Sequence, residues 1–92
     1  MNKKALKKYK FIRVDWADAQ SDCEWGSIDK IKEWADKDCI IHDVGWLVYE
    51  GDRYIVISSQ FGEDGEFGNR TKIPKQWIVK RSDIKPKKRE NK

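Results

Sequence analysis

The sequence predicts a mainly β (α+β) fold, either a small barrel or a strongly bent antiparallel sheet of four to five strands, with one short helix. Two observations carry this prediction. Apolar and polar residues alternate from Phe11 to Trp16, which is the period of a half-buried strand. Between Cys39 and Phe61, two apolar runs rich in β-branched and aromatic residues are separated by Gly51-Asp52, as in a β-hairpin.

The chain length of 92 residues provides for one domain with a modest core. We predict a single small β domain over residues 9–84, between two basic, disordered tails at residues 1–8 and 85–92. All five tryptophans lie within the predicted domain, where they supply a large apolar area from few residues.

A two-residue loop at Gly51-Asp52 also predicts the register of the hairpin. Glu50 then pairs with Arg53 and Tyr49 with Tyr54, so opposite charges meet beside the turn and aromatic rings meet behind it. Both faces of this hairpin are apolar. The second face, which carries the two tyrosines, is expected to be covered by the helix, by barrel closure or by another copy of the chain.

Ser27 is the expected N-cap of the one helix, because Ile28, Ile31 and Trp34 follow it at the spacing of one apolar stripe. Such a short helix is marginal by itself, so this stripe is expected to dock on the sheet. Gly45 within a strand indicates a bulge or the close approach of another backbone segment.

The C-terminal part of the predicted domain contains a loop and a last strand. Gly62 to Arg70 holds three glycines and is expected to form a mobile loop. β character resumes from Thr71 to Arg81, and Pro74 restricts that stretch to an edge or to the start of a strand.

Charge is strongly segregated along the chain. The net charge of +4 hides a charge of +5 in each of residues 1–10 and 80–92, and of −6 in residues 11–79, which hold eight basic and fourteen acidic side chains. A nucleic-acid-binding face on the acidic middle region would work against its own field. The tails offer weak, salt-sensitive contacts to nucleic acid through Lys3, Lys4, Lys7, Lys8, Lys87, Lys88 and Arg89.

No pattern typical of catalysis is present. His42 is the one histidine, and it is next to Asp43 in an expected strand, where neighbouring side chains diverge. Cys23 and Cys39 are expected to be free thiols, and together with His42 they provide three candidate zinc ligands, one fewer than a structural site requires. We therefore expect a protein that is not an enzyme and has no metal or cofactor.

The chain shows no targeting signal. No apolar stretch reaches the length of a membrane span, and the basic N-terminus is not followed by an apolar signal-peptide core. The cytoplasm is the expected location, and no membrane contact is expected.

A series of short motifs occurs in order between about Phe11 and Ile84: Val14-Asp15-Trp16, Asp18-Ala19, Trp25, Val44-Gly45-Trp46-Leu47, Ile55-Val56-Ile57, Ile73-Pro74-Lys75 and Ile78. This series resembles short phage- and prophage-encoded proteins of unknown function. The resemblance implies a small SH3-like barrel or bent-sheet β domain in the cytoplasm of a bacterial host cell, and it assigns no functional residue.

As a function, the resemblance implies a non-enzymatic viral module that binds a host protein or complex, such as a host defence system that it would inhibit. Trp25 and Trp77 have the weakest periodic support and are the first candidates for exposed binding anchors, although burial is the commoner outcome for a tryptophan. The other candidate partner-binding residues are Tyr49, Tyr54, Glu63, Asp64 and Glu66.

Two alternatives remain open from the sequence. One is a nucleic-acid-binding module that uses the basic tails and exposed aromatic residues. The other is a homo-oligomeric structural protein, which the two apolar faces of the hairpin suggest.

Overall fold

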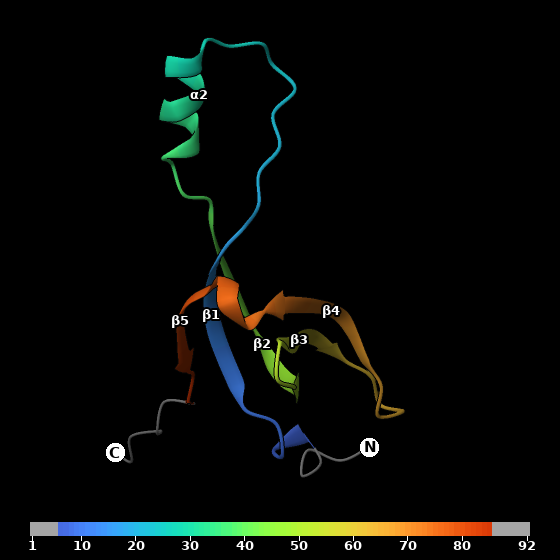
Figure 1. Cartoon of the computed structure of the whole chain (residues 1–92). Coiled ribbons are helices and arrows are strands. Elements are labelled where there is room, and N and C mark those ends of the chain that lie inside the picture. Colours follow the sequence, from blue (N-terminus) through green and yellow to red (C-terminus); the bar gives the residue numbers. More distant parts are fainter. Residues whose placement is uncertain (1–5, 86–92) are drawn as a thin grey trace, which may run out of the picture.

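The structure, a computed structural model that describes residues 6–85, has a mainly β fold. One sheet of five antiparallel strands, in the order β4-β3-β2-β1-β5, is accompanied by one short helix (Figure 1). This confirms the bent sheet rather than a closed barrel. The elements are β1 (Phe11–Ala17), α2 (Ile28–Ala35), β2 (Ile40–Glu50), β3 (Tyr54–Phe61), β4 (Phe67–Pro74), the 3₁₀ turn η1 (Lys75–Trp77) and β5 (Ile78–Asp83).

The core lies on one face of this sheet. Alternation along β1 directs Ile12 and Val14 inward, as predicted, and both are completely buried. They pack against Ile55, Ile57 and Ile73 from β3 and β4. Partly buried side chains extend this cluster at its margins: Trp16, Leu47 and Ile78.

Gly45 allows β2 and β3 to approach closely. A Cβ atom at this position would lie 2.7 Å from the carbonyl oxygen of Ser58 and 3.3 Å from the Cβ of Ile57. Real Cβ atoms do not come so close to backbone atoms, so a side chain here would push the strands apart. The prediction of a close backbone approach at Gly45 is confirmed.

The predicted register of the β2–β3 hairpin is wrong. Glu50 pairs with Ile55 and not with Arg53. The N–H of Gly51 donates to the carbonyl of Tyr54 at 2.9 Å, so the loop starts one residue later than expected. The rule that places glycine within the loop fails because Gly51 does not adopt the positive φ that only glycine tolerates easily.

A β-bulge between Leu47 and Tyr49 divides the second face of the hairpin. Leu47 packs against the core, whereas Tyr49 is 58% exposed. Tyr54 is half-buried beneath the cations of Arg53 and Lys72, which lie 5.5 and 4.9 Å from its ring centre. The bulge therefore removes Leu47 from the face on which Tyr49 lies opposite Val56.

The predicted loop and last strand also change. The loop expected over Gly62–Arg70 is too long, because Phe61 already pairs with Phe67 at the start of β4. The strand expected over Thr71–Arg81 is divided by η1 into the end of β4 and β5. β4 is an edge strand that ends at Pro74, which agrees with the restriction that proline imposes.

The helix forms as predicted but does not dock on the sheet. The Ser27 side chain accepts a hydrogen bond from the Lys30 N–H at 3.3 Å and caps α2. Residues 18–39 form an arm that carries α2 away from the sheet (Figure 1), and no residue of α2 is buried. At the base of the arm, the Asp18 N–H donates to the Cys39 carbonyl at 2.9 Å. The prediction of docking is wrong because polar residues on both sides of α2 provide nothing to hold it on the sheet.

The described chain begins with a turn. The Tyr9 N–H donates to the Leu6 carbonyl at 3.1 Å, and the Tyr9 ring packs edge-on against Phe67, with 5.0 Å between ring centres. Most of both predicted tails lies outside the described residues, including Lys3, Lys4, Lys87, Lys88 and Arg89.

Glu50 connects β5 and η1 to the end of β2. Its carboxylate accepts two hydrogen bonds from the Arg81 guanidinium, at 3.0 and 2.9 Å, and lies 3.1 Å from the Lys75 ammonium. The hydrogen bonds to Arg81, and then to Lys75, hold the pKa of Glu50 at about 2.

This pKa predicts a contribution to stability that depends on pH. The folded-state pKa of Glu50 is below the ordinary value of 4.5, so the contribution is fully present above about pH 4.5 and is lost as the pH falls towards about 2. Glu50→Gln should cost less than about 1 kcal/mol at neutral pH, because the Glu50 side chain is 38% exposed and the Arg81 side chain 31%. Urea unfolding across this pH range should show a weaker acid dependence for Glu50→Gln than for the arm variant Glu33→Gln. Equal acid dependence in the two variants would contradict this role of Glu50.

Candidate functional site

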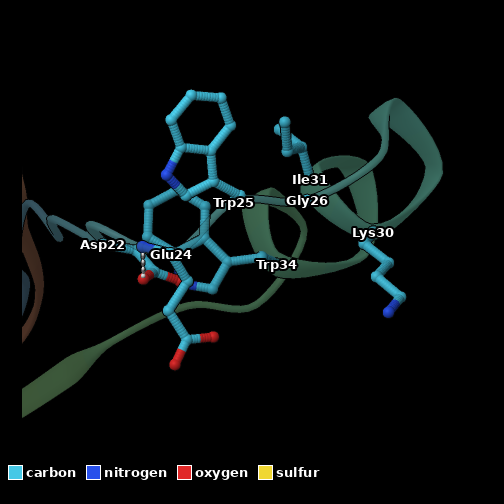
Figure 2. Close-up of a pocket in the computed structure, with 7 residues that line it drawn as sticks. All are labelled: Asp22, Glu24, Trp25, Gly26, Lys30, Ile31 and Trp34. Carbon is cyan, nitrogen blue, oxygen red and sulfur yellow. Dashed lines mark hydrogen bonds between the residues drawn. The ribbon is translucent and has the colours of Figure 1, made fainter.

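The end of the arm presents large apolar side chains to solvent. Trp25 is fully exposed, and along α2 the exposed fractions are 66% for Ile28, 47% for Ile31 and 38% for Trp34. We call these four residues the arm tip. A groove of about 410 Å³ lies here, bordered by Trp25, Ile31, Trp34 and neighbouring polar residues, and the Lys30 side chain points away from the two indole rings (Figure 2).

Local sequence explains this display. The Ser27 cap starts α2, so that Ile28, Ile31 and Trp34 lie three residues apart on one helix face. Trp25 precedes the cap, in a segment where the Glu24 N–H donates to the Asp22 carboxylate at 2.9 Å. No part of the sheet covers this face, so the exposed part of the stripe is available to another molecule.

The arm is acidic. Residues 18–39 contain seven acidic and three basic side chains, which gives a net charge of −4. The acidic residues are Asp18, Asp22, Glu24, Asp29, Glu33, Asp36 and Asp38. The arm tip is thus an apolar patch with an acidic rim.

The other sequence-predicted partner-binding residues lie at separate places. Trp77 is 41% exposed and stacks on Trp16, with ring centres 6.4 Å apart. Tyr49 and Tyr54 flank the β2–β3 turn. The acidic residues Glu63, Asp64 and Glu66 are exposed in the β3–β4 turn. The structure does not bring these residues together with Trp25.

Sequence reasoning missed Ile28, Ile31 and Trp34 as surface residues, because their spacing is also the signature of a helix that packs on a core. A usable signal was present around the helix. Residues 18–24 and 36–38 contain no large apolar side chain that could anchor it on the sheet. An apolar stripe between two such segments indicates a projecting element.

A second surface lies where both ends of the described chain meet. Tyr9, Phe11 and Trp46 border a groove of about 710 Å³, in which Phe11 and Trp46 pack edge-on at 5.4 Å. We call it the terminal groove. Its full lining is Leu6, Lys7, Tyr9, Lys10, Phe11, Trp46, Asp83, Ile84 and Lys85.

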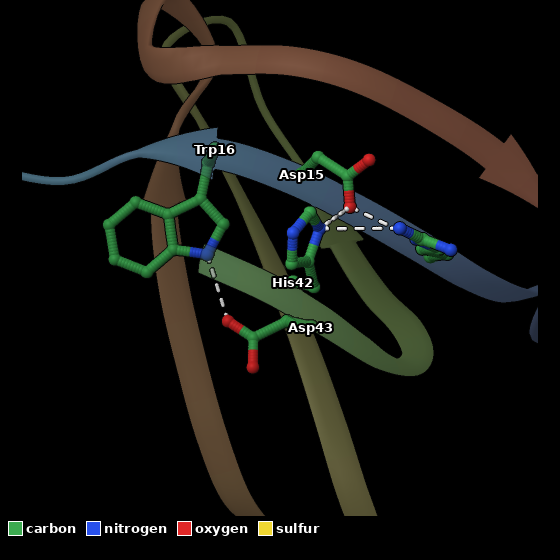
Figure 3. Close-up of polar contacts among 5 residues, drawn as sticks. Asp15, Trp16, His42 and Asp43 are labelled. Carbon is green, nitrogen blue, oxygen red and sulfur yellow. Dashed lines mark hydrogen bonds and ion pairs between the residues drawn. The ribbon is translucent and has the colours of Figure 1, made fainter. Parts of the chain in front are cut away.

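His42 has a carboxylate partner across the sheet. Its Nδ1 lies 2.6 Å from the Asp15 carboxylate, which also accepts a hydrogen bond from Arg13 Nε at 3.0 Å (Figure 3). The pKa of Asp15 is lowered, first by the hydrogen bond with His42 and then by that with Arg13. Asp43 instead accepts from the indole N–H of Trp16 at 2.8 Å. Adjacent residues on β2 thus have different partners.

Within residues 6–85, no three His, Cys, Asp or Glu side chains lie close enough together to hold a metal ion. Cys23 is exposed, Cys39 is half-buried, and both are free thiols.

Comparison with protein-family models, curated proteins and solved structures finds no match for this chain. In the part of the chain that the structure describes, no helix has the length and apolar character needed to cross a membrane.

Proposed function

We propose that this chain is a non-enzymatic binding module that holds a partner protein by its arm tip. The observation that carries the proposal is the exposure of Trp25, Ile28, Ile31 and Trp34 on one projecting element. Apolar patches with a polar rim mark interaction sites in proteins. Tryptophan is among the residues that contribute most to such interfaces.

The form of α2 also supports a partner. A helix of eight residues is marginal in water unless its apolar face is packed against something. In the described chain, the side chains on that face stay 66% (Ile28), 47% (Ile31) and 38% (Trp34) exposed. An apolar groove on a partner would bury it, as in the recognition of an amphipathic helix by a groove.

The charge of the arm defines the chemistry of this partner. A net charge of −4 around the arm tip favours a groove rimmed by lysine and arginine, because complementary charge speeds association and excludes wrong partners. The resemblance to phage-encoded proteins makes a bacterial host protein, including a component of a defence system, the first partner to test.

The test compares a pair of variants with the same number of changes. Trp25→Ser with Ile31→Ser alters the arm tip, and Val44→Thr with Val79→Thr alters two side chains on the sheet that are 50% and 64% exposed. Tagged full-length chains are used to capture proteins from nuclease-treated bacterial lysate. The captured protein is then purified, and its Kd is measured at low and high salt.

We expect the arm-tip variant to weaken binding at least tenfold, about 1.4 kcal/mol or more. The sheet variant should bind as the unmodified chain does, and binding should weaken as salt increases. Equal binding by the arm-tip variant, with circular dichroism showing that every variant is folded, would refute the proposed site.

A further inference from the structure

The terminal groove carries a second inference, which does not depend on the arm. Its walls combine the rings of Tyr9, Phe11 and Trp46 with the exposed lysines Lys7 and Lys85. We infer that this groove binds single-stranded nucleic acid, with bases against the aromatic rings and phosphates against the lysines.

The rings are arranged as a connected row. Trp46 packs against Phe11 at 5.4 Å and against Phe61 at 6.4 Å, and Phe67 joins Phe61 to Tyr9 at 5.0 Å on each side. Each ring is only half-buried, so the row keeps part of its surface available. Aromatic side chains of this kind accept unpaired bases by stacking, because every base has a flat π-face.

The charge of the groove complements a polyanion. Its lining holds three lysines and one acidic residue, Asp83, which is 3.6 Å from Lys10. The lining draws on both ends of the described residues, through Leu6 and Lys85. The acidic arm extends from the other end of the sheet (Figure 1).

This placement changes the expectation drawn from charge alone. A nucleic-acid-binding face on the acidic middle region would oppose its own field, but the groove draws its lysines from the two ends of the domain. Phe11 and Trp46 provide the rings from the middle region. A single strand fits better than a duplex, because only unpaired bases can reach rings that line a groove. It also fits better than a membrane, which would require apolar side chains that protrude.

The test measures the anisotropy of a fluorescent single-stranded oligonucleotide of about 12 nucleotides, titrated with the full chain at about 50 mM and about 200 mM salt. One variant replaces Lys7, Lys10 and Lys85 with glutamine. Its matched control makes the same three changes on the arm, at Lys30, Lys32 and Lys37. A third variant, Phe11→Leu, keeps an apolar side chain and removes the ring.

We expect the groove-lysine variant to bind at least tenfold more weakly. The slope of log Kd against log salt should fall by about 2, because each of the three lysines would make one phosphate contact and each such contact on a single strand contributes about 0.7. Phe11→Leu should bind at least fivefold more weakly, because one stacked base contributes about 1–3 kcal/mol. The arm-lysine control should bind as the unmodified chain does, and a duplex of the same sequence should bind more weakly than the single strand.

Several results would overturn the inference: no binding at low salt, equal weakening in both lysine variants, an unchanged Kd for Phe11→Leu in a chain that remains folded, or tighter binding to duplex. Binding to vesicles that contain an anionic lipid, without binding to the oligonucleotide, would also overturn it and assign the groove to a membrane surface. Light scattering on the free chain completes the test. If the chain is a dimer, and the variant with Lys7→Gln, Lys10→Gln and Lys85→Gln is a monomer, the groove is assigned to self-association.

Discussion

Gly45→Ala is expected to lower the free energy of unfolding by about 1–3 kcal/mol. The added Cβ atom would lie 2.7 Å from the Ser58 carbonyl oxygen, which is a backbone atom held in the β2–β3 pairing. It cannot rotate away as the end of a flexible side chain would. By β-propensity alone, alanine should be more favourable than glycine in a strand. A decrease in the free energy of unfolding would therefore be direct evidence for the close approach.

Gly26→Ala is the matched control. A Cβ atom at Gly26 would have ordinary contacts, at 3.7 Å from Lys30 and 3.9 Å from Ile31. Thermal unfolding followed by circular dichroism should place the Tm of Gly45→Ala lower by about 4–8 °C for each kcal/mol lost, while Gly26→Ala stays near the unmodified chain. A Tm for Gly45→Ala equal to that of the unmodified chain would show that β2 and β3 are farther apart than described.

Replacement of residues 19–38 by Asn-Gly is expected to leave the sheet folded and to abolish capture of the partner protein. The Asp18 N–H already donates to the Cys39 carbonyl at 2.9 Å, next to the Ala17–Ile40 pair, so a two-residue hairpin loop can close the strands there. None of the buried core residues comes from the arm. The shorter loop also lowers the entropy cost of closure, by about 0.6 kcal/mol for each halving of its length.

Urea unfolding should therefore give the shortened protein a stability at least equal to that of the full chain, and capture from lysate should fall to background. Oligonucleotide binding at the terminal groove should be unchanged, which separates the two proposed sites. A loss of more than about 1 kcal/mol would mean that the arm contributes to the fold. Undiminished capture would place the protein-binding site on the sheet.

Several features were predictable because they depend on residues close together in the sequence. The alternation of β1 identifies Ile12 and Val14 as core residues, and the hydroxyl of Ser27 caps α2 as its position before the apolar stripe suggests. Gly45 was recognisable because a glycine between β-forming residues usually marks a close approach.

Other features depend on contacts between distant residues. The bulge between Leu47 and Tyr49 shifts the hairpin register, and no local pattern distinguishes a bulged strand from a regular one. The terminal groove was also not predictable in this way, since Phe11 meets Trp46 only through the pairing of β1 with β2.

The sequence alone predicts β1, the β2–β3 hairpin and α2, because alternation and capping act over a few residues. It also determined that charge is divided between basic ends and an acidic middle region. The tertiary structure decides that the stripe from Ile28 to Trp34 faces solvent, and it places Lys7 and Lys85 beside the rings of Tyr9, Phe11 and Trp46. The physical reason is that an apolar stripe has the same spacing whether a sheet, a partner or water lies against it. What covers it depends on the path of the chain around it.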